Sequence, residues 1–302
     1  MSTSYTKPAL TLEQQADLLL SRGLKDVSKE ILVTKLASVN YYRLRGYTYP
    51  YQDNSKEDTP FLKNNSWNYI WNDYVMDSRL RSLLFESIGH IEIALRTQIE
   101  LVMSLSHGPT WYTDSRYFYN TDFFTKNLDE LEKCWERSEE EFKKHYEEKY
   151  INTELPPSWM IFETSTFGLT SKYYESIDNN YLEKAEIAKY FGFGKSQVFI
   201  FISWLKHLTT VRNVCAHHSR LYSRANINRP VFPRKIKGAW VNNWPNDDRV
   251  YTSVCIIKKL LDYCAPEYDF VGKLKPIIAT VRKEQFPSMG FPVGWENEPL
   301  FK

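Results

Sequence analysis

Apolar residues recur at intervals of three and four between residues 84 and 102, and this pattern constrains the fold more than any other feature of the sequence. The apolar positions are Leu84, Ile88, Ile91, Leu95, Ile99 and Val102. That spacing puts them on one side of a helix, which gains stability only when the stripe is buried. The periodic segment begins near Ser66 and stops at Gly108-Pro109. The sequence therefore predicts one long amphipathic helix with other helices packed against it.

Shorter helices are predicted before this segment. Thr11 can cap a helix that stops at Gly23, and Ser28 can cap a second helix. Residues 40–51 are rich in tyrosine and contain a glycine and a proline, so we expect a loop or a short extended piece there.

Helical patterns continue after the long helix. Residues 128–150 combine many charges with apolar residues at helical intervals, which favours a solvated helix with one packed face over an acidic binding tail. Further helices are expected over residues 159–163 and 183–191, and Ser196 can cap a helix that reaches His218.

The composition changes after Ser223, where prolines and glycines make a helix improbable until Asp248. Residues 231–240 could hold a short hairpin, and a last helix precedes a tail rich in glycine and proline. The predicted fold class is all-α. We expect an N-terminal helical region over residues 1–60, a helical core over residues 61–225, and a C-terminal connector and helix over residues 226–302.

Composition narrows the class of protein. With 302 residues and 42% apolar content, the chain can bury a sizeable core. It shows no secretory signal at its start and no run of about 18 apolar residues, so a soluble, cytoplasmic protein without a membrane partner is expected. Its four cysteines lack CxxC spacing, which argues against a disulfide framework or a zinc ribbon. The net charge is only +2, so any surface for nucleic acid must be local.

The polar cluster Arg212-Asn213-Val214-Cys215-Ala216-His217 carries the chemistry that we expect. Asn213 and His217 are four residues apart and share a helix face, and the long stem of Arg212 can bring its guanidinium to the same groove. A guanidinium suits a phosphate, and a histidine suits proton transfer near neutral pH. Together these side chains could cleave RNA without a metal ion. His218 could exchange roles with His217, and that choice stays open.

The residues around this cluster resemble the Abi family of the HEPN superfamily, which includes bacterial phage-defence proteins of the AbiD and AbiF type. The likeness covers most of residues 8–224 and fits the R-N-x-x-x-H form of the HEPN motif at Arg212, Asn213 and His217. The family usually has Trp and Asn where this chain has Tyr222 and Ser223. The other segments that carry the likeness are residues 7–11, 40–47, 91–96, 159–160, 163–168 and 211–221.

The resemblance implies a HEPN-like helical bundle and an endoribonuclease toxin that halts growth of an infected cell. It also implies a homodimer whose two motifs share one cleft, control by a small structured RNA, and no metal or other cofactor. The alternative is a HEPN-fold protein that binds RNA without cutting it. An enzyme that acts beside a nucleotidyltransferase is disfavoured, because no glycine-rich phosphate loop or paired-carboxylate motif is present.

Two segments interleave aromatic and basic side chains, as single-stranded RNA binding requires. The alternatives are that the first packs the N-terminal helices onto the core and that the second is a solvated connector. A metal site at Cys215, His217 and His218 is disfavoured, because it has one soft ligand and no second cluster. The RNA-binding candidates are Tyr41, Tyr42, Arg43 and Arg45 in the first segment, Arg234, Lys235 and Lys237 in the second, and His218 and Arg220 beside the motif.

Overall fold

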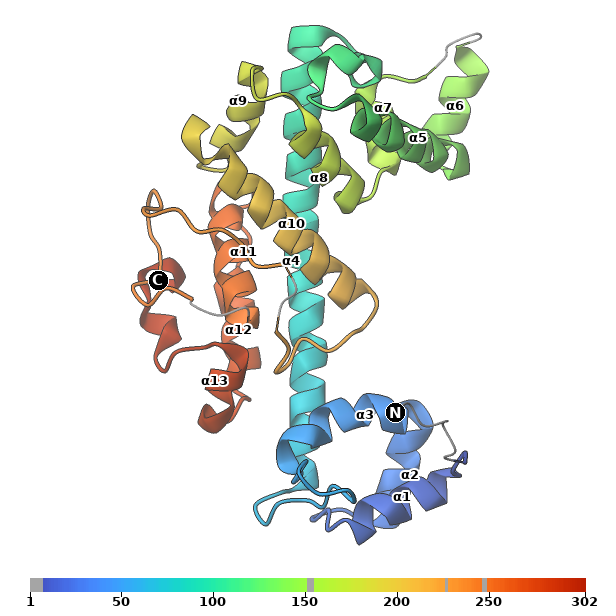
Figure 1. Ribbon diagram of the computed structural model, residues 1–302, viewed down its shortest axis with the longest axis vertical. Coiled ribbons are helices and arrows are strands. Elements are labelled where there is room, and N and C mark those ends of the chain that lie inside the picture. The colour runs from blue at the N-terminus through green and yellow to red at the C-terminus, as the bar shows by residue number, and fades with distance from the viewer. Residues whose placement is uncertain (1–7, 151–154, 226–227, 246–248) are drawn as a thin grey trace, which may run out of the picture. The chain divides into compact units, whose positions relative to one another are not determined.

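The computed structural model describes residues 8–150, 155–225, 228–245 and 249–302, and these ranges are helical with irregular connections (Figure 1). They contain no strand, and only two isolated β-bridges, Gln52 with Phe61 and Phe118 with Ile177. The predicted all-α class is therefore confirmed, and the hairpin considered for residues 231–240 is wrong. Lys7 and Asp248, which the sequence predictions mention, lie outside the described residues.

The described α-helices have the following bounds in chain order: α1 Leu12–Ser21, α2 Lys29–Ser38, α3 Tyr41–Thr48, α4 Trp67–His107, α5 Thr121–Arg137, α6 Glu141–Lys149, α7 Ser158–Ile161, α8 Phe167–Ser176, α9 Leu182–Tyr190, α10 Val198–Ala216, α11 Val250–Cys264, α12 Phe270–Ile278 and α13 Phe286–Met289. Single 3-10 turns lie between several of them. Those that matter below are η1 Tyr49–Tyr51, η3 Ser115–Tyr117, η4 Phe162–Thr164 and η5 Lys195–Gln197.

The chain forms two compact units. The first comprises residues 1–80 with residues 276–283, and the second comprises residues 81–275 with residues 284–302. The three-part division made from the sequence stays a prediction.

In the first unit, both predicted caps are confirmed. The Thr11 hydroxyl accepts from the Gln14 backbone, and the Ser28 hydroxyl accepts from the Ile31 backbone. The prediction of a loop over residues 40–51 is wrong, because this segment forms α3 and η1. The Asn40 side chain caps α3, which buries Leu44 and Tyr47. An N-cap and a buried face outweigh the weak helix propensity of the glycine in this segment.

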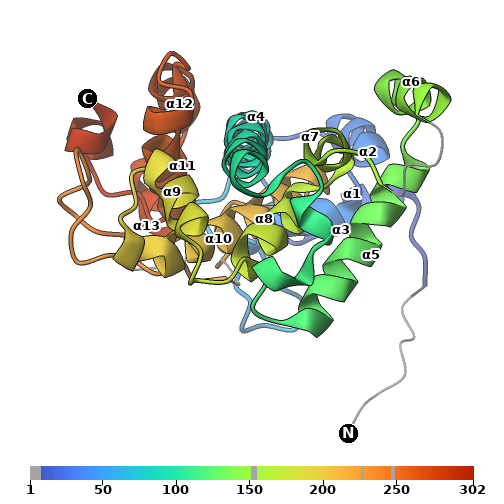
Figure 2. The same cartoon turned by 90° about the horizontal axis from the view of Figure 1, so that it is seen from above.

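In the second unit, the predicted stripe on α4 is the core. Leu84, Ile88, Ile91, Leu95 and Ile99 are fully buried, whereas Val102 is half-buried. Burial of each such side chain contributes about 1.5–3 kcal/mol relative to exposure. Helices α8 and α10 lie on one side of this part of α4, and α11 packs against α10 (Figure 2).

Three details of the second unit differ from the sequence predictions. The helix predicted over residues 128–150 is divided into α5 and α6, because Ser138 is extended. Ser196 is not a cap, since it lies within η5 and α10 begins at Val198. Helix α8 was not predicted. The irregular connector before α11 and the stop of α9 near Gly192 are confirmed.

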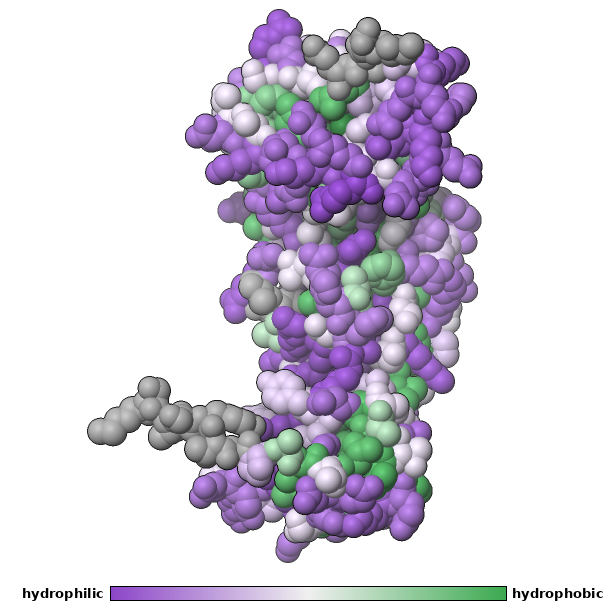
Figure 3. Space-filling model, turned by 90° about the vertical axis from the view of Figure 1, so that its right-hand side faces the viewer, coloured by the Kyte–Doolittle hydropathy of each residue, from purple (hydrophilic) through white to green (hydrophobic). Residues whose placement is uncertain are grey.

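The face drawn in Figure 3 is mainly hydrophilic, with hydrophobic residues in small separate patches. Within the described ranges, no helix combines the length and the apolar character needed to cross a bilayer.

Candidate functional site

The predicted catalytic cluster lies in the second unit at the C-terminal end of α10. One side of this helix is buried, with Trp204, Leu208, Val211 and Cys215 at most 4% exposed. The polar residues of the cluster emerge from the other side: Asn213 and His217 are exposed, and the Arg212 side chain is 30% exposed. Packing of α10 therefore does not explain these polar residues, and their side chains can reach a ligand.

Helix α10 ends between the two histidines in a Schellman turn. The His218 backbone N–H donates to the Cys215 carbonyl at 3.0 Å, and the Ser219 N–H donates to the Val214 carbonyl at 2.9 Å. His218 has a φ of +52°, in the left-handed region that favours glycine. His217 is the C-cap, with φ −84° and ψ 11°. The two imidazoles thus leave the chain from different backbone conformations.

The Arg212 guanidinium lies against α4. Its Nε is 3.9 Å from the Glu92 Oε2, and its central carbon is 5.3 Å from the centre of the Phe85 ring. An ion pair and a cation–π contact both restrict a long side chain and lower the entropy lost when it grips an anion. Arg212 is therefore held against Glu92 and Phe85 and does not extend freely into solvent.

Glu92 is itself fixed by a buried arginine. The Arg96 guanidinium donates to the Glu92 carboxylate at 3.3 Å, to the Glu163 carboxylate at 3.1 Å and to the Ser165 carbonyl at 3.1 Å. The Arg96 side chain is only 8% exposed. The ion pair of Arg96 with Glu92, four residues earlier on α4, is therefore buried, and the bond to Glu163 joins α4 to η4.

This network influences the ionisation of Glu92. Burial raises the pKa of the Glu92 carboxyl above its ordinary value, and the cations of Arg96 and Arg212 and the Phe167 backbone N–H offset part of that rise. The two arginines therefore favour the ionised form that Arg212 needs as a partner. Glu92 consequently connects the motif on α10 to α4 and to the first residue of α8.

Glu100, one turn beyond Arg96, should make stability depend on pH. Burial and the nearby Glu163 raise the pKa of Glu100 from 4.5 to about 8, while Arg96 lowers it. A raised carboxyl pKa contributes stability that is complete below about pH 4.5 and is lost as the pH rises towards 8. We expect Glu100→Gln to be more stable than the wild type at about pH 8, on the order of 1 kcal/mol after allowance for partial exposure.

Urea unfolding followed by circular dichroism at about pH 5 and at about pH 8 measures this effect. Lys172→Gln changes an exposed, surface-paired charge and serves as the control. Equal stability of Glu100→Gln and the wild type at both pH values would contradict the expectation.

The basic connector after α10 returns along that helix. The Asn228 amide donates to the Thr210 hydroxyl at 2.6 Å, and its carbonyl bonds to His207 at 2.7 Å. Farther on, the Val231 N–H donates to the Ser203 hydroxyl at 2.8 Å, and the Trp204 indole donates to the Val231 carbonyl at 2.9 Å. The predicted RNA-binding residues Arg234, Lys235 and Lys237 are exposed on this connector. The buried side chain of His207 anchors the connector at Asn228.

The remaining candidates divide between the two units. His218 is exposed and Arg220 is half-buried beside the motif. Tyr41, Tyr42, Arg43 and Arg45 belong to α3 in the first unit, where Tyr42 is 82% exposed and Arg45 is exposed. Their neighbours Tyr47 and Tyr51 serve packing within the first unit. The Tyr47 hydroxyl donates to Asp77, and the Tyr51 hydroxyl donates to Asp73.

The considered metal site does not form. Cys215 is buried, whereas His217 and His218 are exposed. In the part of the chain that the structure describes, no three Asp, Glu, His or Cys residues gather as metal ligands would.

The family model described as "Abi-like protein" matches residues 34–223. The chain belongs to the Abi-like family. No curated protein and no solved structure matches the chain. Membership of the Abi-like family associates this protein with abortive infection, in which an infected bacterium defends the population against phage.

The Abi-like match contains the motif together with Glu92, Arg96 and Glu163, and it ends at Ser223. The connector along α10 therefore lies beyond the matched range. Sequence reasoning missed Glu92 and Glu163 as neighbours of the site. The four-residue spacing of Glu92 and Arg96 was a visible signal, but Glu163 is 67 residues from Arg96 and only the fold brings the two together.

Proposed function

We propose that this Abi-like protein is a metal-independent endoribonuclease of the HEPN type and acts as the toxin of an abortive-infection system. The observation that carries the proposal is the set formed by the exposed Asn213 and His217 and the partly exposed Arg212, on the side of α10 that faces away from its buried apolar residues. A guanidinium held by Glu92 and Phe85 suits a phosphate, and an exposed imidazole suits a proton transfer.

The proposed reaction uses the RNA's own nucleophile. His217 accepts the proton of the 2′-OH, the 2′ oxygen attacks phosphorus, and the bond from phosphorus to the 5′ oxygen breaks. Arg212 stabilises the crowded, negatively charged phosphorane, and Asn213 orients the imidazole or the substrate. An acid must protonate the leaving 5′ oxygen. The products are a 2′,3′-cyclic phosphate and a 5′-hydroxyl.

The product ends test this chemistry. Purified protein incubated with RNA in EDTA should cut it and leave a 2′,3′-cyclic phosphate and a 5′-hydroxyl, because side chains alone move the protons. Phosphatase and kinase treatment before end-mapping distinguishes these ends from 5′-phosphates. A requirement for Mg²⁺ with 5′-phosphate products would refute the mechanism. Binding without any cut would favour the alternative, a HEPN-fold RNA-binding protein.

We further propose a homodimer. Each chain supplies one Arg212 and one His217, whereas in-line displacement needs both an acid and a base. Two motifs in one cleft would supply both the acid and the base. They would also concentrate positive charge in the cleft, although the net charge of each chain is only +2. A small structured RNA could then inhibit the toxin by covering both motifs.

Cleavage per chain should therefore fall as the protein is diluted below its dimer dissociation constant. Light scattering gives the dimer population, and initial cleavage rates over the same concentrations give the activity. A monomer that cuts at full rate, independent of concentration, contradicts the shared cleft.

A further inference from the structure

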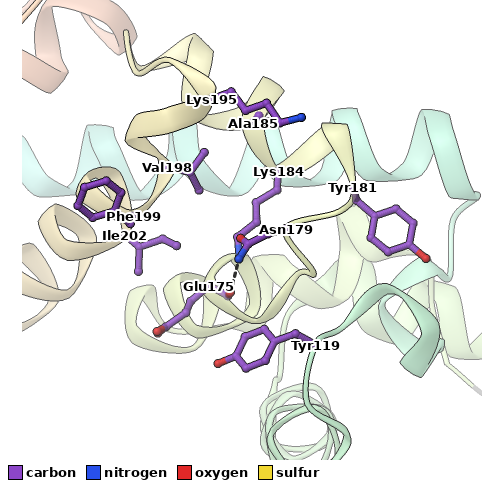
Figure 4. Close-up of a pocket in the computed structure, with 10 residues that line it drawn as sticks. All are labelled: Tyr119, Glu175, Asn179, Tyr181, Lys184, Ala185, Lys195, Val198, Phe199 and Ile202. Atoms are coloured by element: carbon purple, nitrogen blue, oxygen red, sulfur yellow. Dashed lines mark hydrogen bonds between the residues drawn. The ribbon is translucent and has the colours of Figure 1, made fainter.

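A cavity of about 430 Å³ lies where the start of α10 meets the end of α8 and the start of α9 (Figure 4). It is in the second unit, at the end of α10 opposite to the motif. Aromatic, basic and amide side chains line it together, which is unlike the purely apolar lining of a packing defect. The residues used below are Tyr119, Glu175, Asn179, Lys184, Lys195 and Phe199.

Two exposed rings border the cavity. Tyr119 follows η3 and is 53% exposed, and Phe199 lies on the first turn of α10 and is 59% exposed. An exposed phenylalanine at the rim of a cavity contributes little to folding, but its face can stack on a planar ligand. Loss of one such stacking contact weakens binding on the order of 10-fold.

The floor of the cavity holds a buried cation. Lys184 is only 3% exposed, and its Nζ donates to the carbonyls of Glu175 at 2.7 Å and Ile177 at 2.5 Å. These bonds satisfy the Glu175 carbonyl in the last turn of α8 and the carbonyl of its C-cap Ile177, and they use two of the three ammonium hydrogens. The same Nζ is 6.0 Å from the centre of the Tyr119 ring, so positive charge and stacking surface adjoin.

The charge balance of the cavity favours an anion. Its carboxylate, on Glu175, is paired with Lys206 at 2.5 Å. Burial lowers the pKa of Lys184 to about 8, so its ammonium stays mostly protonated at neutral pH, with Asp178 nearby. Together with the exposed Lys195, it leaves the cavity a net positive charge. The exposed amide of Asn179 offers both a donor and an acceptor, which is what recognition of a base edge requires.

One exposed ridge of α10 joins this cavity to the motif. Phe199, Lys206, Thr210, Asn213 and His217 are spaced seven, four, three and four residues apart, so they share one helix face. Phe199 and His217 are about 27 Å apart along the helix. The connector of residues 228–235 runs beside the ridge, since Gln197 near the cavity bonds to the Lys235 carbonyl and Thr210 near the motif bonds to Asn228.

We propose that this cavity binds one nucleotide of single-stranded RNA whose scissile bond lies at the motif, and that it selects where the strand is cut. The base stacks on Tyr119 or Phe199 and is recognised by Asn179, while Lys184 and Lys195 attract the adjoining phosphate. The intervening nucleotides follow the ridge of α10 and its cationic connector. This inference rests on the proposed ribonuclease function, but its binding test does not depend on cleavage.

The test measures binding separately from cleavage. In a His217→Ala background, fluorescence anisotropy with end-labelled single-stranded oligonucleotides should show binding weakened about 10-fold by Tyr119→Ala or by Phe199→Ala. Lys195→Ala should reduce the salt dependence of binding by about one phosphate contact. Tyr150→Ala removes a ring of similar exposure, 47%, outside the cavity and should bind as its parent. Equal affinities of all these variants would overturn the proposal.

A second measurement uses the active protein, in which His217 is retained. Sequenced cut sites in a random RNA library should show a base preference at one position away from the cut, and Asn179→Ala should abolish that preference. A preference that survives both Asn179→Ala and Tyr119→Ala overturns the role in selection. Absence of cleavage, with binding still weakened by the ring variants, would refute the ribonuclease and leave the nucleotide site standing. Titration with free 5′- and 3′-mononucleotides distinguishes a site for a lone nucleotide from one that needs the strand.

Discussion

Arg212→Ala and His217→Ala should each reduce RNA cleavage by at least about 10²-fold while the protein stays folded. Arg212 is the cation placed to stabilise the phosphorane, and His217 is the proton-transfer group that shares a helix face with Asn213. Neither variant removes a buried apolar side chain, because His217 is exposed and the Arg212 side chain is partly exposed. Stability should therefore change little.

The neighbouring histidine supplies the matched control. His218 occupies the left-handed position of the Schellman turn. A left-handed backbone costs a residue with a side chain about 1–2 kcal/mol, and glycine avoids that cost. Because glycine loses more chain entropy on folding than histidine does, the net gain in the free energy of unfolding is about 0.5–1 kcal/mol. His218→Gly should thus melt slightly higher than the wild type and still cut RNA.

Both properties are measurable on the same preparations, by cleavage of a labelled RNA under single-turnover conditions and by thermal melting. Growth arrest on induced expression gives a cellular readout. Full toxicity of a well-expressed His217→Ala variant contradicts the assignment. Loss of cleavage in His218→Gly alone would instead transfer the proton-transfer role to His218.

The parts of this fold that sequence reasoning predicted are those in which local signals agree. The stripe on α4 and the caps at Thr11 and Ser28 each depend on residues within a few positions of one another, so periodicity and side-chain caps identify them. Residues 40–51 were mispredicted because the Gly and Pro signals are local, whereas burial of Leu44 and Tyr47 against the rest of the first unit is not.

The candidate site divides in the same way. The motif is contiguous, so its residue types alone suggested the chemistry. Its supports come from distant segments: Phe85 and Glu92 on α4, and Glu163 on η4. The cavity at the start of α10 likewise collects residues from positions 119 to 202, none of which forms a recognisable motif. Contacts of this kind depend on packing, which a single sequence does not reveal.

Loss of Arg96 should destabilise the protein by about 3–5 kcal/mol, the cost of leaving buried charges without their partner. In Arg96→Ala, Glu92 and Glu163 each lose an ion pair, and the Ser165 carbonyl loses a donor. Urea unfolding gives the difference in free energy. Arg116→Ala is the control. The Arg116 side chain is 78% exposed, so loss of its ion pair with Asp114 should change the free energy of unfolding little.

The dependence of this loss on pH identifies its cause. Burial raises the pKa values of Glu92 and Glu100, whereas Arg96 lowers both, so removal of the arginine raises both further. A carboxyl whose pKa is higher in the folded state than in the unfolded state stabilises the fold only while it is protonated. Its contribution to the free energy of unfolding is lost as the pH rises. The gap between Arg96→Ala and the wild type should therefore widen from about pH 5 to about pH 8. A second variant, Arg96→Met with Glu92→Gln, removes both charges and should recover part of the stability at the higher pH. If the gap is independent of pH and the double variant recovers nothing, Arg96 acts through packing of its stem rather than through the charge that connects α4 to Arg212.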